Sequence, residues 1–241
     1  MAVIGFNDSV IQNVYKAIGT SRSAVGEKIG GIIQNKVLNP MGDAWWAPEA
    51  VKYWKGTDGK GFQPAVKKCE TKIKKAYEQF ADQVRVSVEH WQKNTGKADK
   101  VSAAKFDAPL QIKLNYDVIK KDNNGVVGID DQKATTVEQS LPNVKNDIKA
   151  ELGKLASKLE GVETLFLGKN QAQDVQTCFK QVNEALSELF AFFSDDGDGK
   201  SLKTIIKEYV DKYGSVAQSV SKSFSMDEGS SGSGTTVRPM N

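Results

Sequence analysis

The sequence predicts a mainly α protein, in which a long antiparallel helical hairpin is followed by a small β-hairpin insertion and a C-terminal helical bundle. Three observations predict this fold class. Apolar residues recur at helical spacing over two long stretches in the first 97 residues. The spacing changes to strict alternation of apolar and polar residues in 110–119, as in a half-buried strand. Helical spacing then returns and continues through three further segments.

The first two predicted helices lie within residues 9–97. The first begins at a capping residue, Asp8 or Ser9, and ends at Pro40, and the second begins at Phe62 and is stopped by "NTGK". Two long helices joined by a short connection must fold back on each other to bury their apolar stripes. The stripes are Val10/Ile11, Val14, Ile18, Val25, Ile29 and Ile32/Ile33 in the first helix, and Phe62, Val66, Cys69, Ile73, Ala76, Phe80, Val84, Val88 and Trp91 in the second.

After this hairpin, Asn124-Gly125 predicts a tight turn between strands near 110–119 and 126–130. Three more amphipathic helices follow, and the sequence leaves open whether 142–226 is a degenerate repeat of the first hairpin. Their stripes are Val144, Ile148, Leu152, Leu155, Leu159, Val162 and Phe166; Val175, Cys178, Val182, Leu186, Leu189 and Phe193; and Leu202, Ile205/Ile206, Tyr209, Tyr213, Val216, Val220 and Phe224. The predicted units are the hairpin (1–100), a linker with the β-hairpin (101–141), a three-helix unit (142–226) and a flexible Gly/Ser-rich tail (227–241).

Tryptophans concentrate at the predicted hairpin turn, "GDAWWAPEAVKYW", residues 42–54. Pro48 suits the first position of a helix, and the small Ala50 lets the neighbouring helix approach. If the helix continues through this stretch, Trp46 and Trp54 share one face and close the open end of the hairpin. Trp45 lies on a different face. We therefore expect Trp45 to be exposed and to contact a partner.

Trp46, Pro48, Ala50 and Trp54 follow the spacing W-x-P-x-A-x-x-x-W. This resembles the Trp-Xaa-Gly (WXG) family of helical-hairpin proteins exported by type VII secretion, in which W-x-G-x-A-x-x-x-aromatic links two antiparallel helices. The resemblance covers about residues 8–97, with Pro48 in place of the family's glycine and no tyrosine that fits the export signal Y-x-x-x-[DE]. It implies a non-enzymatic, secreted or surface-associated protein that docks to other proteins.

Charge and hydropathy exclude several classes of partner. Lys and Arg number 33 against 30 Asp and Glu, and the basic residues are spread along the predicted helices, which disfavours nucleic acid. No apolar run is long enough to span a membrane. The start, "MAVIGFNDS", does not fit a cleavable signal peptide. The sequence therefore predicts either export by a non-Sec route or a particle assembled in the cytoplasm.

Few residues are available for catalysis or for binding a metal. His90 is the only histidine, and Cys69 and Cys178 fall in core positions of helices 109 residues apart. These residues cannot supply a clustered zinc site, and a nucleophilic triad would depend on a histidine at a helix surface. We expect no enzymatic activity, no cofactor and no metal, with both cysteines reduced and buried.

The loop "SDDGDGKSL", residues 194–202, resembles the start of an EF-hand, with Asp196 and Asp198 at the third and fifth positions. The twelfth position, which needs a bidentate carboxylate, is Ile205. Calcium binding at these aspartates is therefore a minor alternative to a plain acidic loop between helices.

Three functions fit this sequence. The first is a helical protein that works by protein–protein interaction, as the resemblance implies. The second is a structural subunit of a virion or another multi-subunit particle, in which helical pairs pack against copies of themselves. The third is a helical pore-forming toxin with a β-tongue, which is disfavoured because the charged residues of 110–130 would have to enter lipid.

Overall fold

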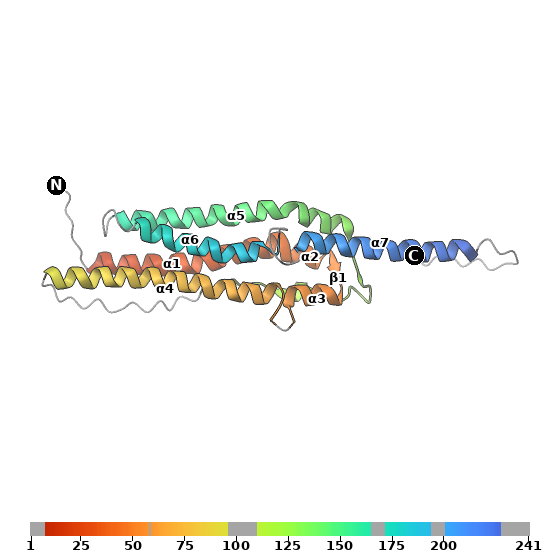
Figure 1. Ribbon diagram of the computed structural model, residues 1–241, viewed down its shortest axis with the longest axis horizontal. Helices are drawn as coiled ribbons and strands as arrows, with labels where there is room; N and C mark the ends of the chain where they lie inside the picture. Colours follow the sequence, from red (N-terminus) through yellow and green to blue (C-terminus); the bar gives the residue numbers. More distant parts are fainter. Residues whose placement is uncertain (1–7, 58, 96–109, 165–171, 194–200, 228–241) are drawn as a thin grey trace.

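Four long helices run side by side along the long axis of the molecule in the computed structural model (Figure 1). The structure describes residues 8–57, 59–95, 110–164, 172–193 and 201–227. The mainly α fold class is confirmed. The long helices are α1 (Asp8–Ile33), α4 (Phe62–Thr95), α5 (Asp131–Thr164) and α6 (Ala172–Phe190), and α7 (Leu202–Asp227) extends beyond one end of the bundle.

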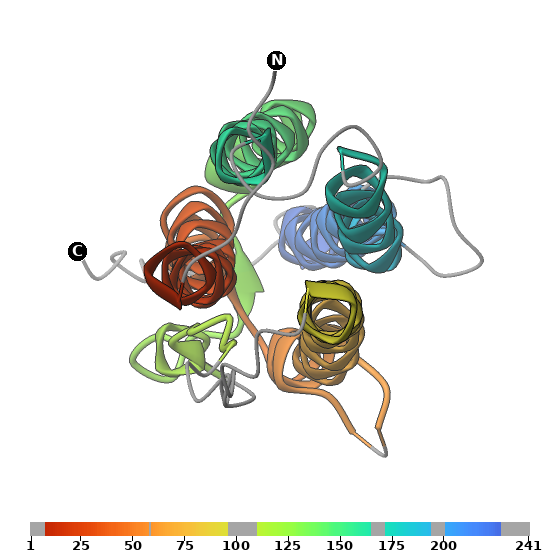
Figure 2. The same cartoon turned by 90° about the vertical axis from the view of Figure 1, so that its left-hand side faces the viewer.

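The two helical pairs form one bundle. Seen from the end, the helices form a ring in the order α1, α5, α6 and α4, in which every neighbour is antiparallel (Figure 2). The most extensive packing joins α4 to α6 and α1 to α5, across the two predicted pairs. Their buried residues form one continuous cluster. The predicted boundaries at residues 100 and 142 therefore do not separate two cores.

The predicted stripes supply most of this core, as amphipathic periodicity requires. The stripe residues of α4 from Phe62 to Val84 are all buried, and so are those of α5 from Val144 to Leu159. The stripe of α6 is buried from Val175 to Leu189. Helical spacing in this sequence therefore identified which faces of these helices point inward.

The first helical segment continues past Pro40, where the sequence predicted its end. Residues Gln34–Leu38 form a π-helix and Asn39–Gly42 form α2, with no break in the helical path. Pro40 lies at the start of α2, directly after the π-helix, where the hydrogen-bond pattern of the helix changes.

Helix α5 begins at Asp131, within the segment predicted as linker and β-hairpin. The Asp130 carboxylate accepts a hydrogen bond from the Lys133 N–H at 3.1 Å, which caps the helix start. Ala134, Val137 and Leu141 are buried in the first turns, and Pro142 lies inside the helix. Burial of this apolar face outweighs the backbone hydrogen bond that the proline removes.

The small antiparallel sheet is also present, but its strands are paired differently from the prediction. Strand β2 (Gly128–Ile129) pairs with β1 (Trp45–Trp46), in the register Trp45 opposite Ile129. The tight turn at Asn124-Gly125 is confirmed, because both residues have positive φ values of 53° and 82°. Residues 110–119 form no strand and do not pair with 126–130.

Residues 110–119, which we call the strap, lie in the groove between α1 and α4 (Figure 2). The predicted alternation is confirmed: Ile112 is buried, whereas Gln111 and Lys113 on either side are exposed. The strap includes one 3-10 turn, Tyr116–Val118. The alternation with a period of two residues correctly predicted an extended chain with one buried face. That face packs against α1 and α4, and the strap is not part of a sheet.

Helix side chains replace the missing ladder of backbone hydrogen bonds along the strap. The Glu70 carboxylate accepts from the Ile112 N–H at 2.5 Å, and the Gln34 amide oxygen accepts from the Asn115 N–H at 2.6 Å. Burial raises the pKa of Glu70, and the bond from Ile112 lowers it in part. Helix α1 presents Gly26 and Gly30 to the strap backbone, which leaves no room for a side chain at either position.

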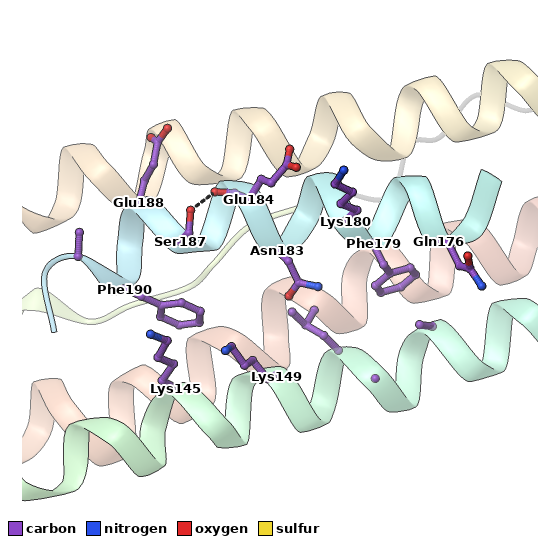
Figure 3. A pocket seen from close by; sticks show the side chains of 14 residues that line it. Lys145, Lys149, Gln176, Phe179, Lys180, Asn183, Glu184, Ser187, Glu188 and Phe190 are labelled. Atoms are coloured by element: carbon purple, nitrogen blue, oxygen red, sulfur yellow. Dashed lines mark hydrogen bonds between the residues drawn. The ribbon is translucent and has the colours of Figure 1, made fainter. Parts of the chain in front are cut away.

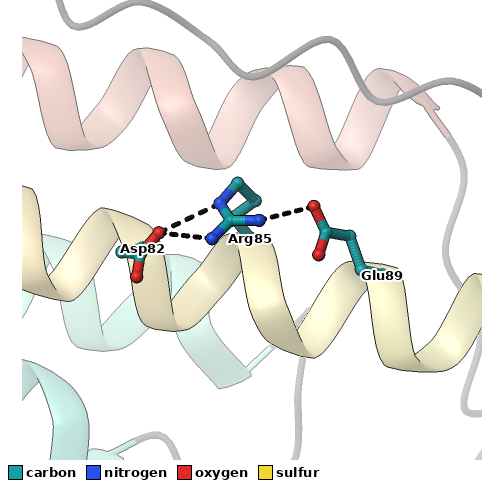
Figure 4. Close-up of polar contacts among 3 residues, drawn as sticks. All are labelled: Asp82, Arg85 and Glu89. Atoms are coloured by element: carbon teal, nitrogen blue, oxygen red, sulfur yellow. Dashed lines mark hydrogen bonds and ion pairs between the residues drawn. The ribbon is translucent and has the colours of Figure 1, made fainter.

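The outer faces of the helices carry exposed ion pairs. The Arg85 guanidinium on α4 donates to Asp82 and to Glu89, three residues before it and four after it (Figure 4). Such pairs support the exposed side of a helix modestly. Among the described helices, none has an apolar stretch long enough to cross a membrane.

We predict that the close approach of the strap makes Gly26 intolerant of a side chain. A Cβ atom at Gly26 would lie 2.6 Å from the Gln111 carbonyl oxygen, so Gly26→Ala should lower the free energy of unfolding by about 1–3 kcal/mol. Gly31→Ala on the same helix meets nothing within 4 Å and should raise it by up to about 1 kcal/mol. Chemical denaturation of both variants measures the difference, and equal effects would contradict the close packing of the strap.

Candidate interaction site

An aromatic cluster lies where α3 (Pro48–Lys55), the start of α4 and the residues after α6 meet α7. Neighbouring rings have centroids 4.9–6.2 Å apart, many of them in edge-on or tilted arrangements that favour aromatic contact. The aromatic cluster consists of Trp45, Tyr53, Trp54, Phe62, Phe192, Phe193 and Tyr209.

Trp45 belongs to this cluster, and only 1% of its surface is exposed. The prediction that Trp45 faces solvent and contacts a partner directly is wrong. Trp45 and Trp46 are adjacent in a strand rather than in a helix, so their side chains point to opposite faces of the sheet. The strand directs Trp45 into the core, where its N–H has no hydrogen-bond partner in the described chain.

The residues of the W-x-P-x-A-x-x-x-W pattern differ in their burial and in the element to which they belong. Trp46 is half-buried in β1 and donates its indole N–H to the Gly42 carbonyl at 3.1 Å. Pro48 begins α3, as predicted, and Ala50 and Trp54 are fully buried. Trp46 lies before α3, so it does not share a helical face with Trp54 as the sequence predicted.

Tyr53 connects α3 to the chain that enters α7. Its hydroxyl donates to the Phe192 carbonyl at 3.1 Å, and the same carbonyl accepts from the Leu202 N–H at 2.8 Å. Burial raises the pKa of Tyr53, because the phenolate would lose its hydration. Tyr53 therefore stays protonated and keeps its donor directed at the point from which α7 begins.

The first half of α7 is held against the aromatic cluster and α3. The rings of Trp45 and Tyr209 lie 4.9 Å apart. The Lys212 ammonium lies 5.5 Å from the Tyr209 ring centroid and 3.8 Å from a Glu49 carboxylate oxygen. Trp45 thus packs against the first half of α7 and helps to fix its direction.

Tyr213 makes a ring contact with Tyr209, and the C-terminal part of α7 continues past the end of the bundle (Figure 1). We call residues 214–227 the projecting half of α7. Val216, which belongs to the apolar stripe of α7, is 52% exposed. The side chains of Val220 and Phe224 lie outside the described residues. Helical periodicity identifies the apolar face of a helix, but it does not determine whether that face is buried.

The remaining predicted sites lie elsewhere. Cys69 and Cys178 are free and buried, as expected. Burial raises the pKa of both thiols to about 12. His90 lies in α4, with its side chain outside the described residues, and the loop with Asp196 and Asp198 and the tail from 228 are also outside. In the described ranges, no group of three or more potential ligands is placed to hold a metal ion.

No protein-family model, curated protein or solved structure matches this chain. The resemblance of residues 8–97 to the Trp-Xaa-Gly family therefore stays a prediction.

We predict that Trp45→Ala lowers the free energy of unfolding by about 3–5 kcal/mol, the usual cost of truncating a buried tryptophan. Trp45→Phe should cost less, because it keeps an aromatic ring in the core and removes the unpaired indole N–H. Trp46→Ala is the matched control and should cost less than Trp45→Ala, since its side chain is half exposed. Chemical denaturation measures all three, and a larger loss for Trp46→Ala would contradict the observed orientation of the strand.

Both native thiols should resist alkylation in the folded protein. Their raised pKa leaves little thiolate at pH 8, and burial excludes a bulky reagent. Because folding raises the thiol pKa, the neutral thiols make their full contribution to the free energy of unfolding below the ordinary thiol pKa of the unfolded chain. That contribution is lost as pH rises from this value toward the folded-state pKa of about 12. Mass spectrometry after maleimide treatment should show no adduct on folded protein and two after unfolding. Rapid labelling of the folded protein would exclude the observed burial.

Proposed function

We propose that this chain is a non-enzymatic protein–protein interaction protein that associates with copies of itself through the projecting half of α7. One observation carries the proposal: α7 extends beyond the end of the bundle, and Val216 of its apolar stripe is 52% exposed there. A helical segment of this length is marginal in water by itself, and packing of its apolar face is the usual source of its stability. A second molecule would supply that packing.

The composition of the projecting half favours a second copy as the partner. Residues 214–227 contain only two charged side chains, Lys222 and Asp227, whereas 26% of the whole chain is charged. Two such segments can therefore pack side by side without repulsion between like charges. Val216, Val220 and Phe224 recur every four residues, which places them on one helical face with serines and an alanine around them. Self-complementary surfaces of this kind form two-fold dimers, the commonest closed assembly.

The resemblance to the Trp-Xaa-Gly family supports the same class of function, and it adds secretion or surface display to the proposal. The residues that carry the resemblance lie in β1 and α3, beside the aromatic cluster that fixes the direction of α7. A structural subunit of a particle is the second candidate. It is favoured by the position of the projecting half at one end of a long bundle, where end-to-end contacts can repeat.

Two truncations test the proposal. Removal of residues 214–241 should give a monomer that keeps the thermal stability of the bundle, because the described part of that segment, 214–227, extends beyond the end of the bundle. Removal of 228–241 alone is the matched control and should leave self-association intact. Sedimentation velocity over a range of concentrations measures the oligomeric state. Dimers would support the interaction protein, and an open series of larger species would support the particle subunit.

Point variants locate the contact within α7. Val216→Asp should raise the dissociation constant by about tenfold or more, since it places a charge in the apolar stripe. Ser215→Asp, one position around the helix, should change it much less. A full-length chain that is monomeric at all concentrations, or a truncated chain that associates as well as the full one, would contradict the proposal.

A further inference from the structure

A second surface, separate from α7, is the groove between α5 and α6. Its volume is about 1100 Å³, and in the described chain its lining comes only from α5, α6 and Ala191, which directly follows α6. In the end view, this pair of helices lies across the ring from α1 and α4, whose groove holds the strap (Figure 2). The bundle therefore has one groove filled by an extended segment and another lined by two helices alone.

The α5/α6 groove combines an apolar floor with positive charge. Leu152, Phe179 and Phe190 form the floor. Lys145 and Lys149 rise from α5 toward α6, and Phe190, Asn183 and Phe179 point back toward α5 (Figure 3). The Lys145 ammonium lies 5.8 Å from the centroid of the Phe190 ring. Lys149 makes no ion pair with the described residues. Lys180, Glu184 and Glu188 also line the groove, but they point away from α5 (Figure 3), and Glu188 pairs with Lys68 and Lys72 of α4.

The filled groove shows what this bundle uses to bind an extended chain. There, alternate strap side chains such as Ile112 are buried, and a carboxylate and an amide of the helices accept backbone N–H groups. Gly26 and Gly30 let the strap backbone approach α1 closely. That site has three components: an apolar floor, polar side chains that accept the backbone N–H groups, and glycine on one wall.

The same three components line the α5/α6 groove. Gly153 on α5 has nothing within 4 Å of where its Cβ would lie, so the wall is open at that point. Asn183 and Gln176 on α6 bear amides that make no hydrogen bond within the described chain. Lys67 and Glu70 of α4 line the filled groove, whereas Lys145 and Lys149 of α5 face across the second one.

We propose that the α5/α6 groove binds an extended segment of a partner protein that presents apolar side chains on alternate residues and carboxylates between them. The apolar side chains occupy the floor over Phe179 and Phe190, and the carboxylates face Lys145 and Lys149. The amides of Asn183 and Gln176 pair with the backbone of the segment. Charge complementarity selects this partner, and the strap shows that such a segment fits between two helices of this bundle.

Two synthetic peptides probe the groove in the full-length protein. Both copy residues 110–119; the acidic one carries Lys113→Glu and the basic one carries Asp117→Lys. The tethered strap keeps its own groove, because its effective concentration exceeds that of the free peptide. Calorimetric titration should show the acidic peptide binding at least about tenfold more tightly than the basic one. Equal binding, or no binding by either peptide, would overturn the proposal.

Variants place the peptide in the groove. Gly153→Trp fills the open wall and should abolish binding, and Lys149→Glu should reduce the affinity for the acidic peptide by about tenfold or more. Val86→Glu, an exposed position on α4, is the control and should change nothing. Unchanged binding to the Gly153→Trp variant would exclude the groove.

An introduced thiol reports occupancy directly. The native cysteines are buried, so in the Ser187→Cys variant only the new thiol, on the lining of the groove, should react with maleimide. The acidic peptide should slow this reaction by at least about tenfold, and it should leave the reaction of a Thr136→Cys variant unchanged. If higher protein concentration alone protects the thiol, the groove binds a second copy and the proposal is wrong. Loss of α7-mediated association does not affect this readout, so the two proposals fail separately.

Discussion

The pairing of β1 with β2 is the interaction on which the arrangement of this protein depends most. The pairing is only two residues long, yet it joins the turn of the first helical hairpin to the start of α5. The Asp130 N–H also donates to the Ala44 carbonyl at 2.7 Å, which extends the connection by one bond. Because strand residues alternate in direction, the same pairing turns Trp45 inward and leaves Trp46 at the edge. The ring of Trp45 then packs against Tyr209 and fixes the position of α7.

This arrangement links the core to the proposed interaction surface. The aromatic cluster packs with the buried stripes of α4, α5 and α6, so the start of α7 is anchored in the core. The projecting half continues from that start as one helix. A binding segment that is already helical loses less conformational entropy on association than an unfolded one does.

The strap fills one of the grooves between neighbouring helices of the bundle. A bundle of four helices leaves shallow grooves between neighbours, and an extended chain fits such a groove when glycine removes side chains from its path. Its backbone still needs hydrogen-bond partners, which Glu70 and Gln34 supply in place of a neighbouring strand. Both the strap and the α5/α6 groove follow from the geometry of helices packed in a ring.

The sequence by itself determined the helices and their inward faces, because a period of 3.6 residues is a local property of the chain. It also determined the alternation of the strap, the turn at Asn124-Gly125 and the helix start at Pro48. Only the tertiary structure decided which elements meet. Strand β2, which lies within 126–130, pairs with Trp45–Trp46 instead of with the strap. The two helical pairs share one core, and Trp45 is buried while Val216 is exposed. Periodicity specifies which side of an element is apolar, but the partner that covers it is set by contacts between residues far apart in the chain.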